Sequence, residues 1–98
     1  MEINKQADGE KLTLALNGRL DTMTSPDLEA VLKESLDGVT ELVFDCSDLE
    51  YISSAGLRVL LGAQKVMNGA GKMLIRNVNE PVMEVFEVTG FTDVFTIE

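Results

Sequence analysis

Apolar and polar residues alternate near the start of the chain, as they do in a strand that buries one face. Leu12, Leu14 and Leu16 lie on one side of an extended chain, and the residues between them lie on the other. A more polar segment precedes them across an Asp-Gly pair, which is a strong signal for a hairpin turn. We therefore predict two paired strands, at residues 3–7 and 12–16.

Helical spacing of apolar residues follows in three segments. The first begins at residues 24–27, where the sequence Thr-Ser-Pro-Asp carries helix-start signals, and it ends at Gly38. The second begins at Ser54 and continues to about Asn68, before a Gly-Ala-Gly sequence. The third begins at Pro81 and ends before a glycine. Each segment has both a start signal and a stop signal, so we predict a helix in each.

Short apolar runs occupy the gaps between these helices and the end of the chain. The run at 41–46 is continuous rather than alternating, which is typical of a central strand buried on both faces. Further strands are expected at 72–76 and 94–97. Because strands alternate with helices and right-handed crossovers make such strands parallel, we predict a single small α/β domain over residues 1–98. Its sheet would be mixed and mostly parallel, with about five strands and about three to four helices.

Acidic residues outnumber basic ones, with 17 acids, 8 bases and a net charge of −9 in 98 residues. Nucleic acids and anionic membranes both attract basic patches, and no such patch is visible. No apolar run approaches the ~20 residues of a membrane span, and the first residues do not resemble a signal peptide. We therefore expect a cytoplasmic protein with neither a nucleic acid nor a membrane as partner.

The chain has no histidine and one cysteine. The absence of histidine excludes a Ser-His-Asp triad and removes the commonest zinc ligand. Cys46 cannot form an intrachain disulfide, and within an apolar strand it is expected to be a small buried hydrophobic residue. Neither a phosphate-binding P-loop nor a G-x-S-x-G nucleophile elbow is present. These absences argue against a conventional hydrolase, and we expect no cofactor and no metal.

Two serines stand where a buried strand gives way to the second helix. Free backbone N–H groups and the positive end of the helix dipole favour an anion at such a position. Ser53 is expected to be the N-cap of the helix, which contributes about 1 kcal/mol. Ser54 is either an ordinary first-turn serine or a site of modification, and its residue type and position alone do not decide between the two.

The second helix has two distinct faces. One face, which can pack on the sheet, carries Val59, Leu60, Ala63, Val66 and Met67. The other carries Ser54, Arg58, Gly62 and Lys65, at spacings of three and four residues. Arg58 is either a solvated charge or a cation placed to reach a phosphate on Ser54. Gly62 has no side chain, so a partner could approach the backbone closely there.

Two further residues near the serines have alternative interpretations. Gly56 allows close approach either of a ligand or of the loop at residues 20–21. Asp21 and Asp48 either cap turns or, as acids near the serines, orient a hydroxyl and shape a docking surface. The sequence does not separate these alternatives.

The segment 45–61, with its Ser-Ser-Ala-Gly-Leu sequence, resembles the phosphoacceptor motif of the STAS family, to which anti-sigma factor antagonists belong. Residues 18–21 (Gly-Arg-Leu-Asp) are similar to the early G-x-L-D element of the family. Residues 89–95 (Thr-Gly-Phe-Thr-Asp-Val-Phe) are similar to its closing T-G-hydrophobic pattern. The resemblance covers nearly the whole chain, and its middle element is the specific one.

This resemblance implies a regulatory protein that is a substrate rather than an enzyme. An anti-sigma factor with serine kinase activity would phosphorylate the switch serine. The unphosphorylated antagonist would bind that kinase and displace its sigma factor, and a metal-dependent serine phosphatase would reset the switch. The alternative is a STAS-type protein-interaction or ligand-sensing module without phospho-switching.

The resemblance also implies the site residues. Some family members carry the acceptor hydroxyl directly before the motif glycine, where this chain has Ala55, and others carry it one residue earlier. The expected phosphorylation site is therefore Ser54, with Ser53 as the lesser candidate. The residues expected to bind the partner are Asp21, Ser53, Ser54, Gly56, Arg58, Gly62 and Lys65.

Overall fold

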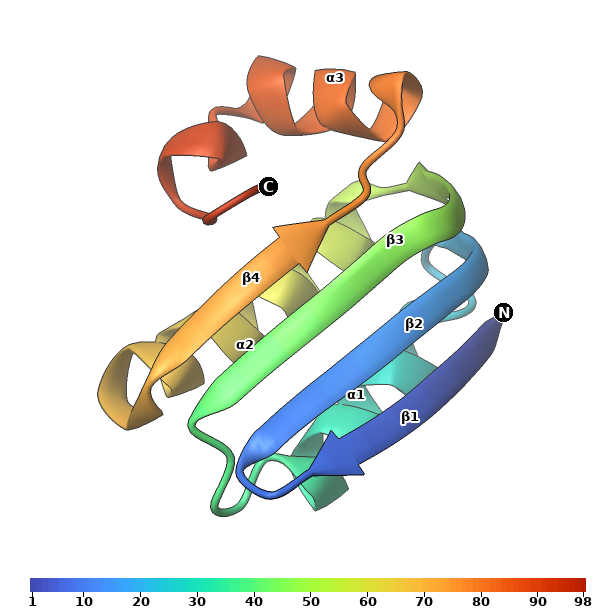
Figure 1. The fold of residues 1–98 in the computed structure, drawn as a ribbon. Coiled ribbons are helices and arrows are strands. Elements are labelled where there is room, and N and C mark those ends of the chain that lie inside the picture. Colours follow the sequence, from blue (N-terminus) through green and yellow to red (C-terminus); the bar gives the residue numbers. More distant parts are fainter.

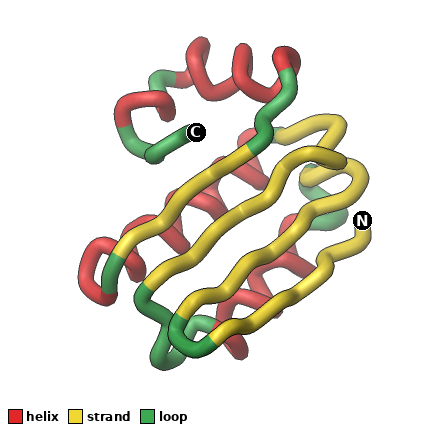
Figure 2. Tube along the Cα trace, viewed as in Figure 1, coloured by secondary structure: helices red, strands yellow, loops and turns green.

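Strands and helices alternate along the chain in a computed structural model that describes all 98 residues. Figures 1 and 2 show helices packed behind the sheet and the C-terminal helix beyond its end. The elements are β1 (Glu2–Asp8), β2 (Lys11–Leu20), α1 (Ser25–Ser35), β3 (Glu41–Ile52), α2 (Ser54–Ala70), β4 (Lys72–Arg76), α3 (Glu80–Thr89) and a 3-10 turn (Phe91–Asp93).

The sheet has the strand order β1-β2-β3-β4. β1 and β2 pair antiparallel as the predicted hairpin, and Gly9 turns between them with a φ of +61°. β2 pairs with β3, and β3 with β4, in parallel. The prediction of a mixed, mostly parallel α/β sheet is therefore confirmed.

The expected fifth strand is wrong, because the sheet has four strands. Residues 94–97 do not form a ladder, and only Ile97 makes an isolated parallel bridge, to Ile75. The chain instead folds back on its own aromatic residues after α3. The Phe95 ring stacks on Phe91 at 5.2 Å between centroids and meets Phe86 edge-on at 5.8 Å. Because of this packing, the chain does not pair with β4 until its last residues.

β3 is longer than its apolar run indicated. The prediction ended the strand at Cys46, before Ser47 and Asp48, but pairing with β2 continues to Ile52. A register shift near the two polar residues lets them lie exposed while Leu49 and Ile52 return to the core. The polar stretch is therefore an irregular part of the strand rather than a turn.

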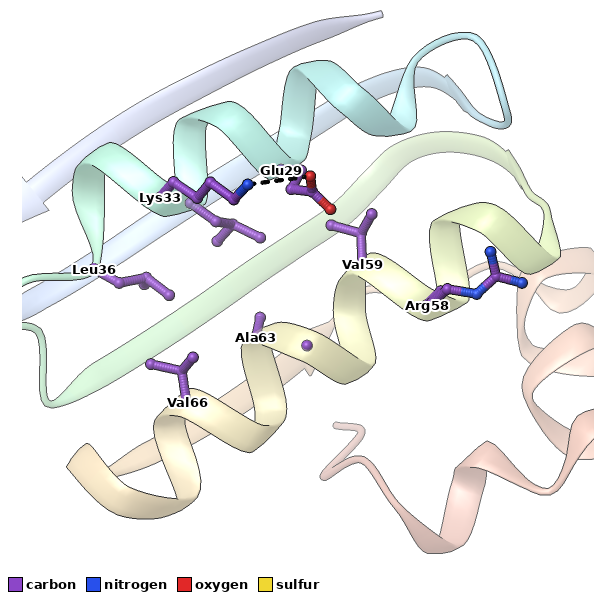
Figure 3. A pocket seen from close by; sticks show the side chains of 9 residues that line it. Glu29, Lys33, Leu36, Arg58, Val59, Ala63 and Val66 are labelled. Atoms are coloured by element: carbon purple, nitrogen blue, oxygen red, sulfur yellow. Dashed lines mark ion pairs between the residues drawn. The ribbon is translucent and has the colours of Figure 1, made fainter.

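The core lies between the sheet and the pair α1 and α2, which cover the same face (Figure 1). In α2 the buried set differs from the predicted one at its edge. Leu60, Ala63 and Met67 are buried as expected, whereas Val66 is 53% exposed. Val66 points toward the space between the two helices, because α1 lies beside α2 on the sheet (Figure 3). No helix of the structure is both long enough and apolar enough to cross a membrane.

Cys46 is buried, as predicted, and this predicts an unreactive thiol. Burial, with a smaller contribution from the Asp45 charge, raises the pKa of the Cys46 thiol from 9.0 to about 12. The thiolate fraction at pH 8 is then about a thousandfold lower than for an exposed thiol, and the thiolate is the reactive form. We expect iodoacetamide to label Cys46 rapidly in denaturant and barely at all in the native protein. Comparable labelling rates in the two conditions would contradict the burial.

Candidate functional site

The carboxyl ends of β2 and β3 bring two distant segments together. These strands are parallel and Leu20 is paired with Ile52, so the loop after β2 and the start of α2 meet at one edge of the sheet. The Ser53 N–H donates to the Leu20 carbonyl at 2.9 Å and holds the two segments in place. The loop that begins at Asp21 and the serine pair are therefore neighbours, as the sequence analysis expected.

The two serines have different roles at the start of α2. Ser53 is the N-cap, as predicted: its backbone is extended and its hydroxyl accepts a hydrogen bond from the Gly56 N–H at 3.4 Å. Ser54 is the first residue of the helix, is exposed, and makes no side-chain hydrogen bond. The capping role is thus filled by Ser53, and the Ser54 hydroxyl is accessible from solvent.

The electrostatic environment at the start of α2 favours an anion. The helix is 17 residues long and has no acidic side chain in its first turn. Its positive dipole end is therefore not neutralised by a residue of the helix itself. A phosphate on Ser54 would lie against this end, where it is locally favourable by a few tenths to about 1 kcal/mol.

Asp21 is engaged by its own loop. Its carboxylate accepts hydrogen bonds from the N–H groups of Met23 and Thr24 at 3.0 and 3.1 Å. Desolvation acts to raise the pKa of Asp21, but these bonds, the Thr24 hydroxyl and the Arg19 charge together hold the pKa below its ordinary value. The turn-capping interpretation accounts for Asp21, which shapes the loop beside the serines. Asp48 is exposed on β3.

Gly56 has to be removed from the surface expected to bind a partner, because it is buried. A Cβ at this position would lie 2.8 Å from the Leu20 Cγ atom and 2.9 Å from the Ile52 Cγ1 atom. Close packing of α2 on the ends of β2 and β3 therefore explains the glycine. Its effect on the site is indirect: it allows α2 to begin beside the β2–α1 loop.

Arg58, Gly62 and Lys65 lie on the exposed face of α2, as predicted. Neither cation makes an ion pair. A Cβ at Gly62 would have no neighbour within 4 Å, so the backbone there faces open space. Figure 3 shows the Arg58 side chain directed back along the helix toward its start, which is the direction of Ser54.

An apolar groove of about 370 Å³ runs between α1 and α2 beside this face (Figure 3). The sequence pattern of α2 does not indicate this groove, because about half of its wall belongs to α1. It is lined by Glu29, Leu32, Lys33, Leu36, Arg58, Val59, Gly62, Ala63 and Val66. Val66 was the available signal, since it lies at the edge of the apolar face next to the exposed one.

Two side chains at the end of the sheet were also missed. Arg19 and Tyr51 are paired across β2 and β3, and the Arg19 guanidinium lies 4.5 Å from the centre of the Tyr51 ring. Met23, in the neighbouring loop, is 84% exposed. No group of His, Cys, Asp and Glu side chains gathers in a way that could hold a metal ion.

The family model of the STAS domain matches residues 2–98. BtrV of Bordetella bronchiseptica, named as a candidate anti-sigma factor antagonist, is 38% identical over 88 residues, covering 88% of this chain and 76% of BtrV. The anti-sigma-B factor antagonist of Staphylococcus aureus is 32% identical over 84 residues, covering 84% of this chain and 78% of that protein.

Solved structures agree in fold. The anti-sigma factor antagonist SpoIIAA in its unphosphorylated form superposes with a TM-score of 0.78 at 18% identity, covering 99% of this chain and 87% of that chain. The phosphorylated form of SpoIIAA gives a TM-score of 0.77 at 19% identity, with 99% and 91% covered. The family model and the two relatives carry the assignment, and these structures agree with it in fold. The chain belongs to the STAS-domain family, and its relatives are regulators of the anti-sigma factor antagonist type.

Proposed function

We propose that this protein is an anti-sigma factor antagonist that works by partner switching in the cytoplasm. Unphosphorylated, it binds an anti-sigma factor that is also a serine kinase. Phosphorylation of Ser54 by that kinase inactivates it, and a metal-dependent serine phosphatase restores it. The names of the curated relatives support the general role, because an anti-sigma factor antagonist acts by binding an anti-sigma factor.

The observation that carries the proposal is that the two serines differ in their structural roles. Ser53 supplies the cap and is tied to Gly56, whereas Ser54 is exposed and its hydroxyl has no partner. A kinase can therefore modify Ser54 without removing a hydrogen bond that the fold uses. The exposed face that begins at Ser54 and continues through Arg58 and Lys65 offers a contact surface for the same kinase.

The proposal also requires that the fold tolerates the phosphate. The two forms of SpoIIAA resemble this chain equally well, with TM-scores of 0.78 and 0.77. This supports a switch that changes a surface rather than a fold. A phosphate adds about −1.5 to −2 charges to that surface.

We predict that Ser54→Ala abolishes phosphorylation while leaving partner binding intact. The test is to incubate the protein with ATP and its cognate anti-sigma factor, and to measure intact mass. We expect one phosphate on the native chain and none on Ser54→Ala, whose melting temperature should be unchanged because the hydroxyl has no partner.

Ser53→Ala is the matched control. Loss of the cap should destabilise the protein by about 1 kcal/mol, yet Ser54 should still be phosphorylated. Phosphate mapped to Ser53, or to any threonine, would show that the assignment is wrong.

A second function has one observation in its favour. The apolar groove between α1 and α2 is within the size range of ligand sites, about 300–1,000 Å³. It would suit a STAS-type interaction or ligand-sensing module without phospho-switching. The same intact-mass measurement separates the two, because such a module would bind partners and never gain a phosphate.

A further inference from the structure

The groove between α1 and α2 is open along its length rather than enclosed. Val66 is 53% exposed on one wall, and Gly62 contributes bare backbone with nothing within 4 Å of its Cβ position. Small-molecule sites usually bury 70–90% or more of their ligand. A ligand in this open groove would remain exposed on one side, which suits a segment of another protein.

The charge balance along the groove differs from that of the whole molecule, which is acidic. Glu29 is paired with Lys33 on α1 at 3.5 Å, so these two side chains neutralise one another. Arg58 lies on the opposite wall without an ion pair, and Lys65 is exposed on the same helix. Arg58 is therefore the one charged side chain on the groove lining without an oppositely charged partner, in a protein of net charge −9. An acidic segment fits this place better than a basic one.

The length of the groove matches a short helix. Along α2 it extends from Arg58 to Val66, and eight residues at 1.5 Å per residue span about 12 Å. A partner helix of about two turns has the same length. Its apolar positions at i, i+4 and i+7 would face Val59, Ala63 and Val66.

We propose that the groove between α1 and α2 receives an acidic amphipathic helix of the anti-sigma factor, with Arg58 as its charged anchor. This inference rests on the proposed function for the identity of the partner. It adds a docking element that lies beside the phosphorylation site, one turn away from Ser54 through Arg58, and that includes residues of α1.

Val66→Glu tests the groove, with Val88→Glu as its matched control. Both valines are exposed on helices, at 53% and 78%, and Val88 lies on α3, outside the groove. The probe is the anti-sigma factor that phosphorylates Ser54, titrated calorimetrically in the absence of ATP against the native chain, which is the parent, and against each variant. We expect Val66→Glu to weaken binding by more than about tenfold and Val88→Glu to change it less than about twofold.

Arg58→Gln tests the charge of the partner. The affinity of the parent should fall as salt is raised, and that of Arg58→Gln should start lower and fall less. Tighter binding by Arg58→Gln would mean a basic partner segment and would overturn the proposal. Melting curves of every variant establish that the fold is intact. Should Val66→Glu be unstable, Gly62→Gln fills the same groove from an open position and is expected to weaken binding in the same way.

These titrations separate failure of groove docking from failure of the proposed function. If the parent binds the anti-sigma factor and both valine variants bind equally well, the groove inference is wrong and the proposed function stands. If the parent itself does not bind, the proposed function fails, and this inference fails with it.

Discussion

Phosphorylation of Ser54 is expected to weaken binding to the anti-sigma factor by more than about tenfold, at least about 1.4 kcal/mol. The melting temperature should change little. These two expectations together define a switch that acts on a surface, and they follow from where the hydroxyl lies in the fold.

Stability should be retained because the phosphate is placed at a helix end that favours anions. The first turn of α2 has no acidic residue, and the Ser54 hydroxyl makes no hydrogen bond that would be lost. Binding should be lost because the phosphate enters the docking face and would have to be desolvated there. It also lies one turn before Arg58, whose side chain is directed toward the start of α2 (Figure 3), and would pair with this cation. The groove would then lose its free positive charge.

The measurement is a titration of phosphorylated and unphosphorylated protein against the anti-sigma factor, beside a melting curve of each form. Ser54→Ala treated with the kinase serves as the control, because it experiences the same handling without the phosphate. A strong downward shift in melting temperature with retained affinity would be incompatible with a surface switch.

Gly56→Ala is expected to destabilise the protein by about 1–3 kcal/mol, the usual cost of overfilling a packed core. The added Cβ would lie 2.8 Å from the Leu20 Cγ atom and 2.9 Å from the Ile52 Cγ1 atom, and both of those side chains are buried. At distances under 3.0 Å, one of these buried side chains or the helix itself must shift to admit the Cβ. The melting temperature should fall by roughly 4–8 °C for each kcal/mol in a domain of this size.

Gly62→Ala on the same helix is the matched control for this change. Its Cβ meets nothing within 4 Å, and alanine favours a helix interior over glycine by up to about 1 kcal/mol. The free energy of unfolding, measured by chemical denaturation, should therefore fall for Gly56→Ala and rise for Gly62→Ala. Equal stability of the two would show that α2 does not pack against Leu20 and Ile52 as described.

Local sequence signals were sufficient for most of the architecture, because each acts over a few residues. The hairpin follows from alternation and an Asp-Gly turn, the start of α2 from the capping residue Ser53, and the start of α3 from Pro81. Ser53 and Asn79 do accept N–H bonds at these two starts. The last strand could not be predicted in the same way. Whether residues 94–97 pair with β4 depends on where the Phe95 ring packs, and Phe86 and Phe91 determine that across a turn.

The sequence by itself determined the class of the fold, the capping role of Ser53 and the candidate status of Ser54, since these depend on periodicity, helix-end chemistry and a family motif. Only the tertiary structure decided between the alternatives for Gly56 and Asp21, because contacts made in the fold determine them. Leu20 and Ile52 leave no space for a side chain at Gly56. The N–H groups of the loop after β2 donate hydrogen bonds to the Asp21 carboxylate. The groove likewise exists only because α1 and α2 lie side by side on one face of the sheet, which leaves Val66 exposed between them. A helical pattern describes one helix at a time, whereas a docking groove is formed by two.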